Sequence, residues 1–365
     1  MTTPSAGRLV GIDLARALAV FGMFVVHLGP EATDTTGVGS WVRHLAEGRS
    51  SALFATLAGF SLVLLAGRLE PKTGVAGRQA KVRIAIRAVI LLALGTVMAA
   101  VYGGVVILAF YGVYFVLALP LVRLRARTLA VIAAVFAVVL PPLALGVKAL
   151  VTEPVAAAVK AYDPLDRLGG VGVLDLLLTG FYPAIPWMAF VVAGMALGRL
   201  DLSSHAVRRR LAVFGPALVV FAYGTSWLIS RSFDGDMPEA VESVWSLLTA
   251  EPHSGMPLDV LGCVGVAITV VVGATVALDR LPLLGKLAAP VIAVGTMSLT
   301  AYVGHFVLSP QMAGGPEAES PTSWAPVLLF ITGTVVFAWI WSRFFRRGPL
   351  EHLLHLATEP AKHVR

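Results

Sequence analysis

The chain has 365 residues, of which 57% are hydrophobic and 13% are charged, and its mean hydropathy is +0.84. A water-soluble domain of this length could not bury so much apolar surface, so the composition excludes that class and indicates an integral membrane protein. The single cysteine excludes a disulfide framework, and the net charge of +7 comes from short basic clusters beside apolar blocks, which is typical of membrane topology and not of nucleic-acid binding.

The apolar residues form continuous blocks of about 18–25 residues, the length that a helix needs to cross a bilayer. Continuous blocks predict helices, whereas a β-barrel would show alternation. The first block contains Asp13 and Arg16 and no cleavage site follows it, so it is interpreted as a retained span. We predict an all-α, polytopic fold of about ten transmembrane helices near residues 9–28, 50–67, 84–101, 104–122, 128–147, 172–198, 211–230, 258–278, 288–309 and 323–342.

Lysine and arginine are concentrated in alternate loops. With a cytoplasmic N-terminus, twenty of the 28 basic residues lie on the inner side and six on the outer side. Because inner loops carry the positive charge in membrane proteins, both termini are predicted to be cytoplasmic.

One domain is predicted, because the chain shows no internal repeat and no soluble segment. Residues 1–348 form this transmembrane domain, and residues 349–365 form a cytoplasmic amphipathic tail that lies along the inner membrane surface. Three long outer loops, at 29–49, 148–171 and 231–257, provide room for a site. They hold most of the acids, including Glu31, Asp34, Glu47, Asp163, Asp166, Asp234, Asp236, Glu239, Glu242 and Glu251.

The first span carries three polar residues on one helical stripe. Asp13 and Arg16 are three residues apart and therefore neighbours on one face. His27 lies eleven residues after Arg16, which is close to three whole helical turns, and therefore falls on the same face. It is roughly 21 Å from Asp13 and close to the outer surface. Since intramembrane charges are costly unless they are paired or face the interior, the stripe predicts a passage with an ion pair inside and an imidazole outside. The alternative is a purely structural ion pair with His27 at the interface.

Four histidines, His27, His44, His253 and His305, fall at outer span ends or in outer loops. An imidazole with a pKa of about 6.5 can take a proton from an attacking amine or hydroxyl. The constellation therefore predicts a general-base site, with His27, His44 and His253 as its catalytic candidates. A zinc site is the alternative, but no HxH, HxxxH or HExxH spacing occurs, so no metal is expected.

Two arginines and one histidine are candidate substrate-binding residues. Arg49 opens the second span, where it could hold an anionic group or reach to the interface. Arg87 lies deep in the third span and could meet a phosphate. His305, near the outer end of the ninth span, is grouped with them. Asp259, one turn inside the eighth span, is interpreted as complementing the helix dipole.

Five segments, in order along nearly the whole chain, resemble the signatures of YeiB-like bacterial membrane proteins. Residues 12–19 (IDLARALA) resemble the family's "IDxxRGxAxxGM" start, and residues 48–54 (GRSSALF) its second-span signature. Residues 252–255 (PHSG) are similar to a late-loop motif of its actinobacterial members. Residues 295–302 (GTMSLTAY) resemble its "GRMALTNY" segment, and residues 348–351 (GPLE) its closing "GPLEW".

YeiB-like proteins are more distantly similar to the heparan-alpha-glucosaminide N-acetyltransferase family of transmembrane acyltransferases. This resemblance implies transfer of an acetyl or related acyl group from cytoplasmic acyl-CoA, as co-substrate, to an acceptor on the far side. In that family an Asn ends the first span and a catalytic His follows in the outer loop. His27 stands where that Asn would stand, His44 is the only His in the loop, and Ala17 replaces the family's Gly.

We therefore hypothesise a membrane-bound acyltransferase. Acyl-CoA would meet Arg16, Arg87 or Lys286 from the basic inner side, and His27 or His44 would deprotonate the acceptor. A small-molecule transporter is the alternative, followed by a structural or regulatory membrane partner. The expected partners are membrane lipids and a small-molecule or glycan acceptor, without nucleic acid and with a homodimer left open. The expected location is the bacterial plasma membrane, as a multi-pass protein.

Overall fold

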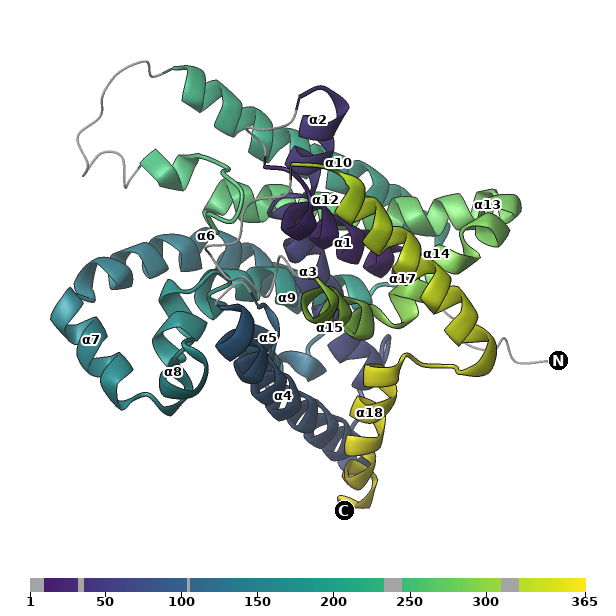
Figure 1. Ribbon diagram of the computed structural model, residues 1–365, viewed down its shortest axis with the longest axis horizontal. Coiled ribbons are helices and arrows are strands. Elements are labelled where there is room, and N and C mark those ends of the chain that lie inside the picture. The colour runs from purple at the N-terminus through teal and green to yellow at the C-terminus, as the bar shows by residue number, and fades with distance from the viewer. Residues whose placement is uncertain (1–9, 32–35, 104–105, 233–244, 310–321) are drawn as a thin grey trace.

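The computed structural model describes residues 10–31, 36–103, 106–232, 245–309 and 322–365, and all regular elements within these ranges are helical (Figure 1). The predicted all-α class is thus confirmed. Part of the predicted outer-loop surface, including the loop at 310–321, lies outside the described residues. The acids Asp34, Asp234, Asp236, Glu239 and Glu242 lie there too.

Seven described helical segments are long and apolar enough to cross a membrane. They are α1 (Val10–Leu28), α2 with α3 (Val38–Ala46 and Arg49–Leu65), α4 (Gly74–Tyr102), α6 (Ala126–Leu150), α10 (His205–Arg231), α12 (Pro257–Arg280) and α17 (Ala325–Phe344). The connecting elements are η1 (Leu121–Arg123), α7 (Glu153–Tyr162), α8 (Pro164–Gly169), η2 (Asp175–Thr179), η3 (Ser246–Leu248) and α13 (Pro282–Leu287).

The remaining predicted spans are broken or short. Helices α14 (Ala289–Thr296) and α15 (Ser298–Leu308) meet at an angle of 84° and count as an eighth span only if taken together. The apolar helices α5 (Leu108–Ala118) and α9 (Ala184–Gly198) have 11 and 15 residues, fewer than the about 20 that cross a bilayer. The number of ten spans therefore stays a prediction.

Helices α1, α3, α9 and α12 lie at the centre of the molecule (Figure 1). Helices α3 and α9 are buried along almost their whole length, which agrees with their apolar character on every side. Glycines let them approach closely, because a Cβ at Gly59 would lie 1.9 Å from the Val191 carbonyl oxygen and one at Gly194 would lie 1.7 Å from that of Thr56. Such small-residue crossings are typical of helices that pack within a membrane.

The outer helices present large apolar side chains to their surroundings. Only 11% of α6, 17% of α10 and 11% of α17 is buried in the windows that could span a membrane. On α17, for example, Leu328 and Leu329 are exposed. An apolar surface of this extent requires a lipid environment, which agrees with a multi-pass membrane protein.

Loops that were predicted to share the inner side contact one another. The buried Arg199 guanidinium donates to the carbonyl oxygens of Gly67, Arg68 and Val122, and so joins three of these loops. Arg208 pairs with Asp279 of the next inner segment. The alternation of loops that the charge pattern predicted is therefore consistent with the packing.

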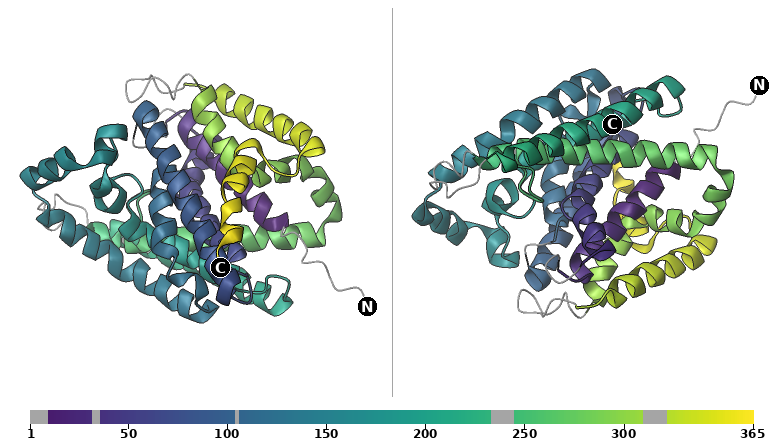
Figure 2. Two further views of the ribbon diagram at one scale, coloured as in Figure 1. Left: turned by 90° about the horizontal axis from the view of Figure 1, so that it is seen from below. Right: turned by 90° about the horizontal axis from the view of Figure 1, so that it is seen from above.

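The C-terminal segment docks on the start of α4, as the yellow and blue ribbons in Figure 2 show. It consists of α18 (Pro349–Ala357) and η5 (Glu359–His363). Arg78 Nε donates to the Arg365 carbonyl oxygen at 2.9 Å, and Gln79 Nε2 donates to that of Lys362 at 2.9 Å. The tail thus contacts the transmembrane part, and its division from residues 1–348 stays a prediction.

The crossing of α1 and α14 is expected to tolerate no side chain at Gly295. A Cβ there would lie 1.7 Å from the Asp13 carbonyl oxygen, so Gly295→Ala must separate the two helices. Overpacking of this kind destabilises by about 1–3 kcal/mol, and thermal unfolding in detergent measures it. Gly273→Ala in α12, where a Cβ meets nothing within 4 Å, is the control, and an equal loss in both variants would contradict this account.

Candidate active site

The outer end of α1 carries a pair of hydrogen-bonded imidazoles. His27 Nδ1 lies 2.9 Å from Nε2 of His305 on α15, and the two rings stack with 5.1 Å between their centroids. His305 is 1% exposed. Because the bond needs one N–H and one lone pair, each imidazole determines the tautomer of the other.

Aromatic rings enclose this pair. Phe306 lies 5.5 Å from the ring of His27, and Phe24 and Tyr302 each lie 5.1 Å from that of His305. The Tyr302 hydroxyl accepts a hydrogen bond from the Ile107 backbone at 3.0 Å, which holds its ring in place. The imidazoles therefore lie in an apolar site, where a hydrogen bond is stronger than in water.

His253 lies on the same side, in the turn that precedes α12. Its φ is +62°, the only positive value at a non-glycine residue in the described ranges, and such a conformation persists only where its surroundings impose it. Its Nε2 accepts a hydrogen bond from the Gly48 backbone at 3.2 Å, and the Asp259 carboxylate accepts one from the Gly255 backbone at 3.1 Å. These two hydrogen bonds hold the turn at His253 and at Gly255. His253 is close enough to His27 to interact with it electrostatically.

Burial lowers the pKa of His253 below its ordinary value, and the nearby charge of Glu47 opposes this effect. The imidazole is therefore neutral at neutral pH. Its buried Nδ1 has no hydrogen-bond partner among the described residues, so this nitrogen has an unused hydrogen-bonding capacity.

Helix α2 fastens the outer end of α1 but does not bring its own histidine to the site. Arg43 Nη1 donates to the carbonyl oxygens of Gly29 and Pro30 at 3.1 and 3.0 Å. The adjacent His44 is exposed, and only its backbone carbonyl takes part in a hydrogen bond that the structure describes, with Arg49 at 2.6 Å. The structure thus gathers His27, His253 and His305 and leaves the His44 ring outside the group.

Arg49 belongs to a separate polar network. Its guanidinium lies 4.6 Å from the centre of the Tyr223 ring and donates to the His44 and Glu47 carbonyl oxygens. The Tyr223 hydroxyl lies 3.5 Å from Cys263 Sγ, which donates to Asp259 Oδ1 at 3.3 Å. Arg49 therefore has structural partners, and its predicted role in substrate binding stays a prediction.

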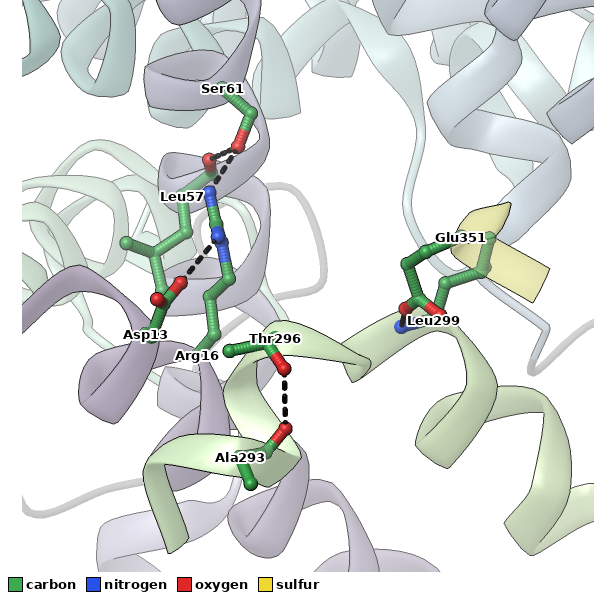
Figure 3. A network of polar contacts seen from close by, with 8 residues as sticks. All are labelled: Asp13, Arg16, Leu57, Ser61, Ala293, Thr296, Leu299 and Glu351. Carbon is green, nitrogen blue, oxygen red and sulfur yellow. Dashed lines mark hydrogen bonds and ion pairs between the residues drawn. The ribbon is translucent and has the colours of Figure 1, made fainter. Parts of the chain in front are cut away.

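The inner end of the stripe on α1 carries the predicted ion pair (Figure 3). Arg16 Nη1 lies 2.9 Å from Asp13 Oδ1, and Arg16 Nη2 donates to Ser61 Oγ of α3 at 2.8 Å. Ser61 in turn donates to the Leu57 carbonyl oxygen. The pairing is confirmed, and both charges face protein rather than lipid, as their cost in a bilayer requires.

Beside this pair lies a cavity of about 300 Å³ whose lining includes Arg16, Ser61, Arg87 and Tyr111. Arg87 has no acidic partner within the described residues, and its Nε is buried without a hydrogen bond. It interacts electrostatically with Arg16 and with other arginines at the same end. The lining thus holds one arginine, Arg87, without an acidic partner in the described residues, beside the paired Arg16 and the carboxylate of Glu351, and an unpaired guanidinium can bind a phosphate.

Glu351 of α18 closes one side of this cavity and caps α15. Its carboxylate accepts from the Leu299 backbone at 2.7 Å, and Figure 3 shows these two residues side by side. It also accepts from the Thr300 hydroxyl at 2.6 Å. A carboxylate at a helix N-terminus satisfies otherwise unpaired N–H groups. The C-terminal segment therefore positions the helix that carries His305.

A layer of rings separates the two ends of the stripe. The cavity ends at Phe54 and Tyr111, whose rings are 5.6 Å apart. The ring of Phe54 lies 6.1 Å from that of Tyr302, which lies 5.1 Å from His305. His27 is not in the lining of the cavity beside Arg16, and the continuous passage between the two ends stays a prediction.

A second polar cavity, of about 440 Å³, opens beside His253. Its lining includes Lys160 and Asp175, which form an ion pair at 3.4 Å, and Thr179, whose hydroxyl donates to Asp175 at 2.6 Å. These groups could bind a polar molecule next to the open Nδ1 of His253.

Three residues that shape the site, Arg43, Asp259 and Glu351, were not predicted as site residues. Asp259 and Glu351 lie in segments that contain or adjoin family motifs, which is the one sequence signal that singles them out. Within the ranges described, no group of three or more His, Cys, Asp or Glu side chains could hold a metal ion.

Two family models match the chain. Residues 8–229 match the model described as heparan-alpha-glucosaminide N-acetyltransferase, catalytic, and residues 217–360 match a protein family of unknown function, DUF418. None of the curated proteins matches. The first match contains His27 and Arg87, and the second contains His253 and His305, so the imidazole group combines residues from both.

Substitution of His253 is expected to change how stability depends on pH. Because the pKa of His253 is lowered in the folded state, the unfolded chain binds more protons near its ordinary value of about 6.5, and stability falls as pH drops through that range. His253→Asn removes this titration and keeps a side chain that tolerates positive φ. Its melting temperature in detergent should fall less than that of the wild type between about pH 7.5 and pH 5.5.

The control for this experiment is His44→Asn, which changes an exposed imidazole and should keep the pH dependence of the wild type. If His253→Asn lost as much stability on acidification as the wild type, the buried neutral state of His253 would be refuted.

Proposed function

The chain belongs to the heparan-alpha-glucosaminide N-acetyltransferase family, and from this membership we propose that it is a membrane-bound acyltransferase. It transfers an acetyl or related acyl group from acyl-CoA on the cytoplasmic side to a hydroxyl or amine acceptor on the opposite side. The observation that carries the proposal is helix α1, which borders an arginine-lined cavity at one end and at the other carries His27, hydrogen-bonded to the buried His305 of α15.

The cavity beside Arg16 is the proposed donor site. Its volume of about 300 Å³ suits the acyl end of the donor, since ligand cavities begin near that size. Arg87 would bind a phosphate of the coenzyme, because its charge has no acidic partner in the described residues. Arg16 is already paired with Asp13 and Ser61, so its role is to hold α1 and α3 together at the cavity wall.

The imidazole pair is the proposed general base. One imidazole takes the proton from the acceptor O–H or N–H while the acceptor attacks the thioester carbonyl. The new C–O or C–N bond forms, the C–S bond breaks, and the coenzyme leaves as a thiolate that is then protonated. The second imidazole orients the first through the 2.9 Å bond, as a base and its orienting partner require. His253 would bind the acceptor through its open Nδ1.

The ring layer formed by Phe54, Tyr111 and Tyr302 serves as a gate in this proposal. Closed, it keeps external water away from the thioester. Transfer requires these rings to move so that the donor carbonyl reaches the imidazoles, a local step of the kind that often accompanies catalysis.

The proposed topology has about ten spans, both termini in the cytoplasm and the bacterial plasma membrane as location. It is supported by the concentration of basic residues in alternate loops. The contacts of Arg199 with two other inner loops, and of the C-terminal tail with the start of α4, agree with this arrangement.

Removal of either buried imidazole is expected to abolish most acyl transfer. His27→Ala and His305→Ala should each lower kcat by about 10²–10⁴-fold, the usual contribution of a general base. Release of CoA from acyl-labelled acyl-CoA by purified protein measures this, and His205→Ala on the exposed start of α10 is the control. If His44→Ala lowered kcat as much as His27→Ala does, the general base would have to be assigned to His44. Substrate flux without consumption of acyl-CoA would indicate a transporter.

Neutralisation of Arg87 is expected to weaken donor binding more than it slows chemistry. Loss of one charge-assisted hydrogen bond, worth about 1.5–3 kcal/mol, should raise KM for acyl-CoA roughly tenfold or more in Arg87→Gln, with kcat little changed. Steady-state kinetics measures both, and Arg343→Gln, which alters an exposed arginine stacked on Trp339, is the control. An unchanged KM would remove Arg87 from the donor site.

A further inference from the structure

An apolar groove of about 510 Å³ lies between α15 and α17. One wall is a single face of α15, from residue 297 to residue 308, and the other is formed by residues 329–337 of α17. The lining is almost entirely hydrocarbon, apart from the hydroxyls of Thr300 and Thr334 and the imidazole of His305.

The groove exists because α15 turns away from α17. Helix α17 packs along α14 and α1, and the chain bends by 84° between α14 and α15. After this bend α15 makes little contact with α17. The Glu351 carboxylate holds the start of α15 in this direction.

Glycines on both walls leave the groove open rather than closing it. A Cβ at Gly304 of α15 or at Gly333 of α17 would meet nothing within 4 Å, in contrast to Gly295, where it would meet the Asp13 carbonyl oxygen at 1.7 Å. Because α17 is exposed along most of its length, the groove opens toward the lipid. A hydrocarbon chain of the bilayer could therefore enter it.

The groove and the donor cavity reach different sides of α15. The donor cavity is lined by Ser298 and Leu299 at the start of that helix, whereas His305 lines the groove and is absent from the donor cavity. A molecule in the groove therefore meets His305, the member of the imidazole pair that lines it. Since the base acts on the acceptor, the groove belongs to the acceptor and not to the donor.

The length of the groove matches one leaflet of a membrane. From residue 297 to residue 308 the axis of α15 advances about 16 Å, roughly half of a hydrocarbon core about 30 Å thick. His305 lies in the last turn of α15, the end that the charge pattern of the loops predicts to be the outer one.

We propose that the acceptor is a lipid of the outer leaflet with a hydroxyl or amine head group. Its hydrocarbon chain lies in the groove between α15 and α17, and its head group reaches His305 and His27. This inference rests on the proposed acyltransferase function and names its acceptor class. The head group loses its O–H or N–H proton to the imidazole pair and forms a bond to the acyl carbon as the thioester C–S bond breaks and CoA leaves.

The activity test uses the full chain in nanodiscs made of bacterial polar lipids, with acyl-labelled CoA and added water-soluble amines and sugars. Label is expected in the extracted lipid fraction, and Gly304→Leu or Gly333→Leu, which fill the groove, should lower its appearance at least tenfold. Gly273→Leu, at an equally open glycine of α12, should leave it unchanged. Label in water-soluble acceptors alone, insensitive to both groove variants, would overturn the lipid acceptor while the acyltransferase function stands.

A second test needs no turnover. A photoactivatable lipid with a diazirine in its acyl chain, present in the same nanodiscs, should cross-link to α15 and α17. Both groove variants should abolish this cross-link, and Gly273→Leu should retain it. Unchanged cross-linking in the groove variants would overturn the placement of the lipid hydrocarbon chain in the groove. Failure of every acceptor to release CoA, with cross-linking lost in the variants as expected, would refute the acyltransferase and leave the lipid site in place.

Discussion

A charged or imidazole side chain within a bilayer is stable only where the protein supplies its hydrogen-bond partners. Helix α1 meets this constraint at both ends, through Asp13 and Ser61 around Arg16 and through His305 beside His27. Asp13 lies on α1 itself, and the other two partners come from α3 and α15, so the polar stripe ties α1 to both of these helices. The cavity beside Arg16 and the imidazole pair lie at these two contacts.

Helix α15 separates the compartments of the site. Its start, capped by Glu351, borders the cavity beside Arg16, and its Tyr302 belongs to the ring layer. Its His305 is one member of the imidazole pair and also lines the apolar groove. One helix can reach all of these because the bend before it directs it away from α17. Its direction is therefore as important to the proposed chemistry as its side chains.

Glycine has two opposite uses in this protein. At Gly59 and Gly295 the missing Cβ allows backbones to touch, which stabilises the centre of the bundle. At Gly304 and Gly333 the missing Cβ meets nothing and leaves room between helices. Sequence patterns do not distinguish these uses, because both appear as a small residue in an apolar block.

The sequence by itself determined the helical membrane class and the pairing of Asp13 with Arg16, because apolar block length and spacing within one helix are local properties. Only the tertiary structure decided that His305 rather than His44 joins His27, and that aromatic rings lie between this pair and the cavity beside Arg16. These contacts join segments far apart in the chain, and their geometry depends on how helices cross and bend. No spacing along the sequence records that geometry.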